Sequence, residues 1–243
     1  GNRDEVHNEY NNIWLHDVYS RLSENYPDRR HFFLTRSGTA GVQRYGAIPW
    51  TGDIERSWSG LQLQIPAAIN AGMSGIPLLT SDVGGFVALD DNPTDPELYL
   101  RWVQLAAFSP NIRTHSATMP EPTNECYADV IDQVRRYVNL HYRYLPYIYG
   151  NICYETYNYG MPLMRSVVFN DMVDDTRLIN CDDEYLFGND ILVAPVVENA
   201  TERDSIFPKG TWVDMYDYSR TFTLGDQLRY EAPLDVLPYF GRL

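Results

Sequence analysis

The stretch RSGTAGVQRYGAIPWTGD, residues 36–53, begins with an arginine and ends with an aspartate. The aspartate, Asp53, follows Trp50-Thr51-Gly52, which places its carboxyl group on a glycine-containing turn beside a large aromatic side chain. Apolar surroundings disfavour the charged form of a carboxyl group, so this position suits an acid whose pKa must be raised. The spacing between Arg36 and Asp53 corresponds to a strand–helix step of an α/β barrel.

Two later segments repeat this arrangement, in which an apolar run ends in polar groups. In GIPLLTSDVGGF, residues 75–86, the run ends at Asp82, and in FSPNIRTH, residues 108–115, it ends at Arg113 and His115. Barrels of alternating strands and helices build their active sites from residues at the carboxyl ends of the strands. These segments therefore predict a barrel whose site contains the named side chains.

Strand and helix patterns alternate through the first part of the chain. Apolar spacing predicts helices over residues 7–24, 57–71, 96–107 and 124–156, and strands over residues 31–35, 44–50, 75–80 and 108–112. Pro66 predicts a kink or a helix start, and Pro146 predicts a break in the last helical region. A complete barrel needs eight such units, and half a barrel exposes sheet edges. We therefore expect the other strands in a segment N-terminal to this chain.

The sequence pattern changes at about Val167. Short apolar runs separated by turn residues follow, as in EYLFGNDILVAPVV and SIFPKGTWVDMYDY, and this spacing is typical of antiparallel strands. We expect a barrel part at residues 1–166 and an all-β part at residues 167–243. No Gly/Ser linker separates the two parts, so they are expected to pack together.

Several motifs of this chain resemble glycoside hydrolase family 31, the retaining α-glucosidases and α-xylosidases. They are Arg36-Ser37 with Ala40-Gly41, Trp50-x-Gly52-Asp53, Ser81-Asp82-x-Gly84-Gly85-Phe86, Arg113-x-His115, and LFGNDILVAPV at residues 186–196. The likeness runs in order over nearly the whole chain. It implies the C-terminal half of a (β/α)8 TIM barrel followed by a β-sandwich.

The resemblance also implies roles for individual residues. Asp53 matches the general acid/base, and Arg36 and His115 match residues that hydrogen-bond hydroxyls of the sugar in the −1 subsite. Asp82 matches a carboxylate near the bound sugar. Arg113 is expected to orient the catalytic carboxylates, while Trp50 and Phe86 are expected to shape the pocket.

Three of these side chains also have a structural interpretation. Gly-Asp is common in turns, so Asp53 is alternatively a turn residue. Asp82 is alternatively a helix cap or the partner of an arginine inside the barrel. An isolated histidine such as His115 is often a structural residue.

The family's nucleophile, an aspartate in a W-x-D-M-N-E type motif, lies upstream of the region that this chain matches. The local match Trp212-Val213-Asp214-Met215 belongs instead to a turn that resembles the family's β-sandwich, so Asp214 is not expected to be the nucleophile. The chain alone is therefore expected not to turn over substrate. Its expected partner is the N-terminal half of the same barrel.

The expected substrate is an α-linked oligosaccharide or glycoside, cleaved by an exo-acting α-glucosidase. Ile54, directly after Gly52-Asp53, is closer to the α-xylosidase branch, so an α-xylosidase is the first alternative. A carbohydrate-binding module without catalysis is the second. Transfer of the sugar to an acceptor other than water uses the same residues and stays open.

Bulk composition restricts the partners further. The formal net charge is −14 and Lys209 is the only lysine, which argues against binding to nucleic acid or anionic membranes. Cys126, Cys153 and Cys181 form no zinc or disulfide pattern, so buried free thiols are expected. The mechanism implied by the resemblance uses carboxylates alone, without metal or organic cofactor. The segment Asp90–Asp95 is expected to be an exposed acidic loop and not a calcium site.

Overall fold

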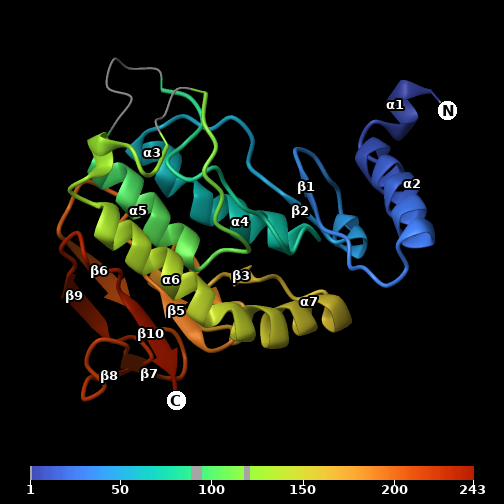
Figure 1. The fold of residues 1–243 in the computed structure, drawn as a ribbon. Coiled ribbons are helices and arrows are strands. Elements are labelled where there is room, and N and C mark those ends of the chain that lie inside the picture. The colour runs from blue at the N-terminus through green and yellow to red at the C-terminus, as the bar shows by residue number, and fades with distance from the viewer. Residues whose placement is uncertain (1, 89–94, 118–120) are drawn as a thin grey trace.

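Helices alternate with parallel strand segments in the first part of the chain, and antiparallel strands dominate the second (Figure 1). The computed structural model describes residues 2–88, 95–117 and 121–243. The helices are α1 (Arg3–Val6), α2 (Tyr10–Asn25), α3 (Trp58–Gln62), α4 (Gln64–Met73), α5 (Pro96–Ala107), α6 (Ile131–Tyr147), α7 (Cys153–Tyr159) and α8 (Thr176–Ile179). Short 3-10 turns cover Val42–Tyr45 and Glu125–Tyr127.

The strands are short. They are β1 (Phe33–Thr35), β2 (Ala47–Pro49), β3 (Met164–Arg165), β4 (Tyr185–Phe187), β5 (Ile191–Val193), β6 (Glu202–Ile206), β7 (Thr211–Asp214), β8 (Thr221–Thr223), β9 (Gln227–Glu231) and β10 (Tyr239–Arg242).

Four parallel segments lie side by side in the barrel part. β1 pairs with β2, with Leu34 opposite Ile48. Isolated parallel bridges continue the series from Trp50 to Thr80 and from Val83 to Thr114. The chain therefore supplies neighbouring parallel strands of a barrel, and the carboxyl ends of these strands point to the same edge. The prediction of a partial TIM barrel followed by an antiparallel sheet is confirmed.

The expected strands at residues 75–80 and 108–112 are wrong as continuous strands. Only single bridges form there or directly after them, at Thr80 and Thr114. Pro77 and Pro110 lack the N–H group that a ladder needs, which accounts for the interruption. The strand expected over residues 44–50 is shorter than predicted, because a 3-10 turn extends to Tyr45 and β2 begins at Ala47.

The proline-based predictions for the helices hold in their main features. The region 57–71 consists of two helices, α3 and α4, and Pro66 lies in the first turn of α4, where its missing N–H costs nothing. The region after Glu125 is interrupted just beyond Pro146, where a π-helical turn, Ile148–Ile152, connects α6 to α7. A local i→i+5 turn of this kind is a common way to accommodate a helix interruption.

The tyrosines of this region divide between the core and the surface. Tyr127 and Tyr137 are buried and belong to the apolar core. Tyr149, Tyr154 and Tyr157 are exposed, with 88% of Tyr157 accessible.

The second part contains a six-stranded antiparallel sheet and a β6–β9 pair. The strand order in the large sheet is β3-β4-β5-β10-β7-β8. Apolar side chains from this sheet, including Leu192 and Phe240, pack with Ile206 and Tyr230 from the β6–β9 pair in one core. Because β3 already belongs to the large sheet, the division of the chain between residues 166 and 167 stays a prediction.

The two parts of the chain pack directly on each other. One apolar core contains Trp102 of α5 together with Phe187 of β4 and Tyr239 of β10. Arg101 is fully buried and donates hydrogen bonds to the carbonyl oxygens of Ala200, Ala232, Pro233 and Val236. Helices α5 and α6 lie across the sheet in Figure 1, and the predicted packing of the two parts is confirmed.

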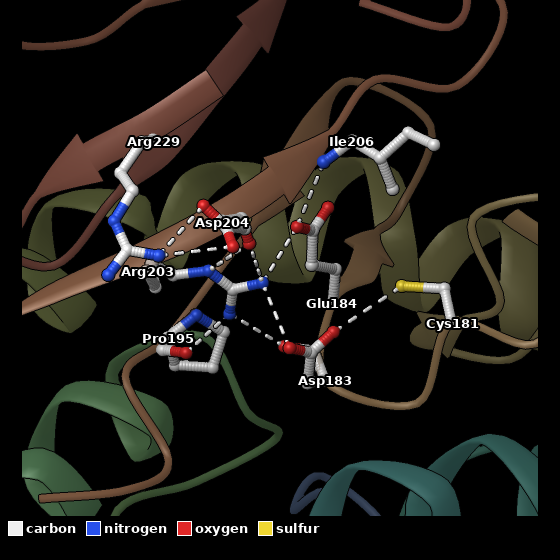
Figure 2. A network of polar contacts seen from close by, with 8 residues as sticks. All are labelled: Cys181, Asp183, Glu184, Pro195, Arg203, Asp204, Ile206 and Arg229. Atoms are coloured by element: carbon white, nitrogen blue, oxygen red, sulfur yellow. Dashed lines mark hydrogen bonds and ion pairs between the residues drawn. The ribbon is translucent and has the colours of Figure 1, made fainter. Parts of the chain in front are cut away.

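A buried charge network lies in the β-sheet part (Figure 2). Arg203 donates to Oε1 of Glu184 at 2.7 Å and to Oδ2 of Asp183 at 3.2 Å. The backbone N–H of Ile206 also donates to Oε1 of Glu184. Burial raises the pKa of Glu184 to about 7, although the nearby Arg203 guanidinium acts in the opposite direction.

Glu184→Gln is expected to remove a pH-dependent loss of stability. Because the folded-state pKa of Glu184 is raised from 4.5 to about 7, the folded protein binds this proton more tightly than the unfolded chain. The contribution of Glu184 to the free energy of unfolding therefore falls as the pH rises from about 4.5 to about 7, and it is constant above this range. The size of this fall is about 3 kcal/mol.

Urea unfolding of both proteins at about pH 5 and about pH 8 measures this effect. The difference in unfolding free energy between variant and wild type should change by that amount, in favour of the variant at the higher pH. An identical difference at both pH values would contradict the assignment. Using the difference cancels the titration of all other groups.

Candidate active site

The predicted site residues follow the parallel segments at their carboxyl ends. Arg36 follows β1 and Trp50 follows β2, while Asp82 and His115 come just after the bridge residues Thr80 and Thr114. Backbone bonds align these ends, since Thr51 N–H donates to the Thr80 carbonyl at 3.0 Å. Side chains that are far apart in the sequence therefore gather at one edge of the partial barrel.

Arg36 holds Asp53 in a two-pronged ion pair. Its guanidinium nitrogens donate to Oδ1 of Asp53 at 2.7 Å and to Oδ2 at 3.1 Å. Both side chains are accessible, with relative exposures of 60% and 45%. The Arg36 hydrogen bonds lower the pKa of Asp53, and this effect outweighs burial. The expected raised pKa is therefore wrong for the chain described, because a paired and half-exposed carboxylate is stabilised in its charged form.

Asp82 differs from Asp53 because its side chain is completely buried. It lies 2.9 Å from Nη1 of Arg113, yet neither of its carboxylate oxygens has an aligned hydrogen bond within the part of the chain that the structure describes. Burial raises the pKa of Asp82, while Arg113 and His115 act in the opposite direction. A buried carboxylate with unsatisfied oxygens is costly and is found where a ligand can supply the missing donors. The alternative of an arginine partner also fits the geometry.

Aromatic groups complete this edge of the barrel. The guanidinium of Arg113 lies 4.8 Å from the centre of the Trp50 ring, a favourable cation–π distance. The rings of Phe86 and His115 are 5.2 Å apart with an angle of 31° between their planes. His115 thus has an aromatic neighbour that restricts its orientation.

The charges form one electrostatic unit. Arg36, Asp53, Arg113 and His115 all influence the pKa of Asp82, and His115 also lowers that of Asp53. The structure therefore brings together Arg36, Trp50, Asp53, Asp82, Phe86, Arg113 and His115, the residues predicted from the sequence. What this set can do chemically is to bind hydroxyl groups and to exchange a proton through Asp53.

Two family models match this chain. The glycosyl hydrolases family 31 TIM-barrel domain matches residues 1–151, and the glycosyl hydrolase family 31 C-terminal domain matches residues 160–243. The chain belongs to glycoside hydrolase family 31.

The relatives of this chain in family 31 include an α-glucosidase and an α-xylosidase. The chain is 36% identical to α-glucosidase 2 of Bacillus thermoamyloliquefaciens over 97% of its own length and 29% of the relative. It is 35% identical to an α-xylosidase of Saccharolobus solfataricus, over 88% of this chain and 29% of that protein.

A solved structure of a family 31 dextranase from Flavobacterium johnsoniae superposes with a TM-score of 0.89, at 30% identity, over 99% of this chain and 30% of that chain. A family 31 sulfoquinovosidase from E. rectale gives a TM-score of 0.87 at 30% identity, over 100% of this chain and 37% of that chain. The chain therefore spans less than two fifths of the length of these relatives.

Asp214 lies away from the candidate site, in β7 of the sheet. Its carboxylate is buried and accepts hydrogen bonds from Tyr230, Arg220 and the backbone of Tyr216. These contacts give Asp214 a structural role in the β-sheet part and support the prediction that it is not the nucleophile.

Arg56 is the residue near the site that the sequence analysis missed. It is buried, and it contacts the segments that carry Phe86 and His115. The signal in the sequence is weak: an arginine soon after Asp53, with no periodicity or motif around it.

The described residues can also be compared with the requirements of metal sites, membrane-spanning helices and disulfides. No group of three or more His, Cys, Asp or Glu residues lies close enough to hold a metal ion among residues 2–88, 95–117 and 121–243. Within the same ranges no helix combines the length and apolar character needed to cross a membrane. The three cysteines are free thiols and are partly buried. Of the expected acidic loop, residues 90–94 lie outside the described residues, while Asp95 caps α5.

Proposed function

We propose that the polypeptide carrying this chain is an exo-acting retaining α-glycosidase of the α-glucosidase type, active on oligosaccharides. The observation that carries the proposal is that Asp53, paired with Arg36, lies at one barrel edge together with the buried Asp82 and the exposed His115. Family membership supports the reaction class. Asp53 is the general acid/base, and the nucleophile belongs to the N-terminal half of the barrel.

The reaction proceeds in two steps. In the first, protonated Asp53 donates its proton to the glycosidic oxygen while the nucleophilic carboxylate attacks C1, so the C1–oxygen bond breaks and a glycosyl–enzyme ester forms. In the second, the Asp53 carboxylate removes a proton from water, whose oxygen attacks C1 and releases the nucleophile. Carboxylates that act in this way lie about 5–5.5 Å apart.

The low pKa of Asp53 in the described chain fits only the second step. A second carboxylate at that distance disfavours the charged form of its neighbour, and so does the exclusion of water by the rest of the barrel. We infer that both effects raise the pKa of Asp53 in the complete polypeptide. Arg36 then exchanges its carboxylate contact for contacts to sugar hydroxyls, which its planar fork can bridge.

Asp82 is proposed to accept hydrogen bonds from the sugar in the −1 subsite, with Arg113 holding its position. Arg36 and His115 donate to the same sugar, and Trp50 and Phe86 form the apolar wall. Oδ2 of Asp82, which has no hydrogen-bond partner among the described residues, supports this role, while Oδ1 faces Arg113.

Asp82→Asn is expected to raise KM about tenfold or more, because a hydrogen bond to a charged acceptor contributes about 1.5–3 kcal/mol. Steady-state kinetics on the complete polypeptide measures this effect. Asp183→Asn, at a carboxylate that also contacts an arginine but lies in the β-sheet part, is the matched control. Equal KM values for wild type and Asp82→Asn would contradict sugar contact by Asp82.

An α-xyloside is the alternative substrate, favoured by Ile54 and by the α-xylosidase among the relatives. Hydrolysis of aryl α-glucoside and aryl α-xyloside by the complete polypeptide tests the choice. A higher kcat/KM for the glucoside supports the proposal, whereas a higher value for the xyloside overturns it in favour of the alternative. Activity on neither sugar would refute both.

A further inference from the structure

Arg56 lies three residues after Asp53 and is 6% exposed. Its Nε donates to the carbonyl oxygen of Gly84 at 3.1 Å, and its Nη2 donates to the hydroxyl of Ser116 at 2.7 Å. The Ser116 hydroxyl in turn donates to the carbonyl oxygen of Phe86 at 2.8 Å. One buried guanidinium thus joins the segment after Asp53 to the two segments that carry Phe86 and His115.

Backbone bonds connect the same three segments. The N–H groups of Phe86 and Val87 both donate to the Ile54 carbonyl, at 2.8 and 3.1 Å, and the Arg56 N–H donates to the Val87 carbonyl at 2.8 Å. The Ala117 N–H donates to the Phe86 carbonyl at 3.0 Å. The segment with Phe86 therefore contacts both of the others. The Arg56 side chain adds a direct link between the segment after Asp53 and the segment that carries His115.

Gly85 shows how closely these segments approach. Its φ is +78°, and a Cβ atom at this position would lie 2.7 Å from the Cα atom of Arg56. Only glycine fits such a backbone conformation and distance. The close approach places the Arg56 side chain where it can reach both Gly84 and Ser116.

We propose that Arg56 is a positioning residue that acts through Ser116 to fix Phe86 and His115 relative to Asp53. This proposal rests on the proposed function, since it assigns Arg56 a role in the same site. Arginine suits the task because its planar fork holds two acceptors in fixed directions and its charge does not titrate. Hydrogen bonds in series, from Arg56 to Ser116 to Phe86, polarise and strengthen one another.

The test compares two buried arginines in the complete polypeptide. Arg56→Lys keeps the charge but loses the fork, and Arg101→Lys makes the same change at the buried arginine between α5 and the β-sheet part. Both variants are expected to lower Tm to a similar extent. Only Arg56→Lys is expected to lower kcat/KM, by about 100-fold, the size of effect that an ångström-scale misplacement produces. Ser116→Ala, which removes only the bridging hydroxyl, is expected to lower kcat/KM about tenfold and serves if Arg56→Lys fails to fold.

A double-mutant cycle separates positioning from general destabilisation. In a His115→Ala background, Arg56→Lys or Ser116→Ala should lower kcat/KM by a clearly smaller factor than in the wild-type background, because one of the two groups that they position is absent. An undiminished loss in that background would overturn the proposal. So would equal losses of kcat/KM in Arg56→Lys and Arg101→Lys.

An NMR measurement that needs no substrate hydrolysis tests the positioning role of Arg56 separately from the proposed function. The ring signal of His115 in the NMR spectrum, assigned by its absence in His115→Ala, should shift in Arg56→Lys and stay unchanged in Arg101→Lys. If the wild type hydrolyses no α-glycoside, the proposed function fails while this shift still supports positioning by Arg56. An unshifted His115 signal in Arg56→Lys would overturn the positioning proposal alone.

Discussion

Asp53→Ala is expected to lower kcat on an aryl α-glycoside by about 1,000-fold, within the range that a general acid or base contributes. The substitution removes the group that is proposed to protonate the leaving oxygen and later to deprotonate water. An α-glycosyl fluoride should be affected less in the first step, because fluoride leaves without a proton. Added azide should then restore its turnover, because azide attacks C1 without losing a proton. Steady-state kinetics on the two substrates, with and without azide, measures this pattern.

The matched control for Asp53→Ala is Asp204→Ala. Asp204 is also an exposed aspartate that forms an ion pair with an arginine, Arg229, but it lies in the β-sheet part. Its replacement should leave kcat unchanged. A kcat for Asp53→Ala within about threefold of wild type would remove Asp53 from the acid/base role, since general acid–base catalysis contributes at least about 100-fold.

The second large effect concerns residues 1–243 on their own. They are expected to give no turnover of any α-glycoside, because the proposed mechanism needs a second carboxylate close to Asp53. Addition of the separately produced N-terminal half of the barrel should restore turnover, measured as release of the aryl group. Turnover by residues 1–243 alone that disappears in Asp53→Ala would place the nucleophile within this chain and contradict the proposed mechanism.

The composition of the candidate site could be predicted from the sequence because strand order determines it. Arg36, Asp82 and His115 each follow an apolar run, and parallel neighbours bring the ends of such runs to one edge. The lengths of those runs as strands could not be predicted from apolarity alone. Pro77 and Pro110 reduce the later strands to single bridges, an effect that depends on which backbone groups face a neighbour.

The electrostatics of the site were less accessible to sequence reasoning. The pattern around Trp50 predicts a raised pKa for Asp53, but the pairing with Arg36 reverses the direction. Whether an arginine points at a carboxylate depends on the path of the whole loop between them. The same limit explains why Arg56 was missed, since its role depends on contacts with Gly84 and Ser116 that are distant in the sequence.

The proposed arrangement gives different roles to two carboxylates that lie at one barrel edge in different environments. Asp53 is accessible and can exchange a proton with substrate and water, while Asp82 is buried and held by Arg113. Environments that push two carboxyl groups apart in pKa are a general way to assign them different roles. In the described chain the pKa of Asp53 is lowered and that of Asp82 is raised, so the acid role proposed for Asp53 depends on the rise in its pKa inferred for the complete polypeptide.

The most direct test of the account follows the anomer that is released first. The complete polypeptide is mixed with an aryl α-glucoside, or with the xyloside if that is the better substrate, and NMR records the first sugar formed before it equilibrates in water. Initial release of the α-anomer, lost in Asp53→Ala, is the predicted result, because two successive displacements at C1 retain configuration. Initial release of the β-anomer would contradict the double displacement and the role of Asp53 in it.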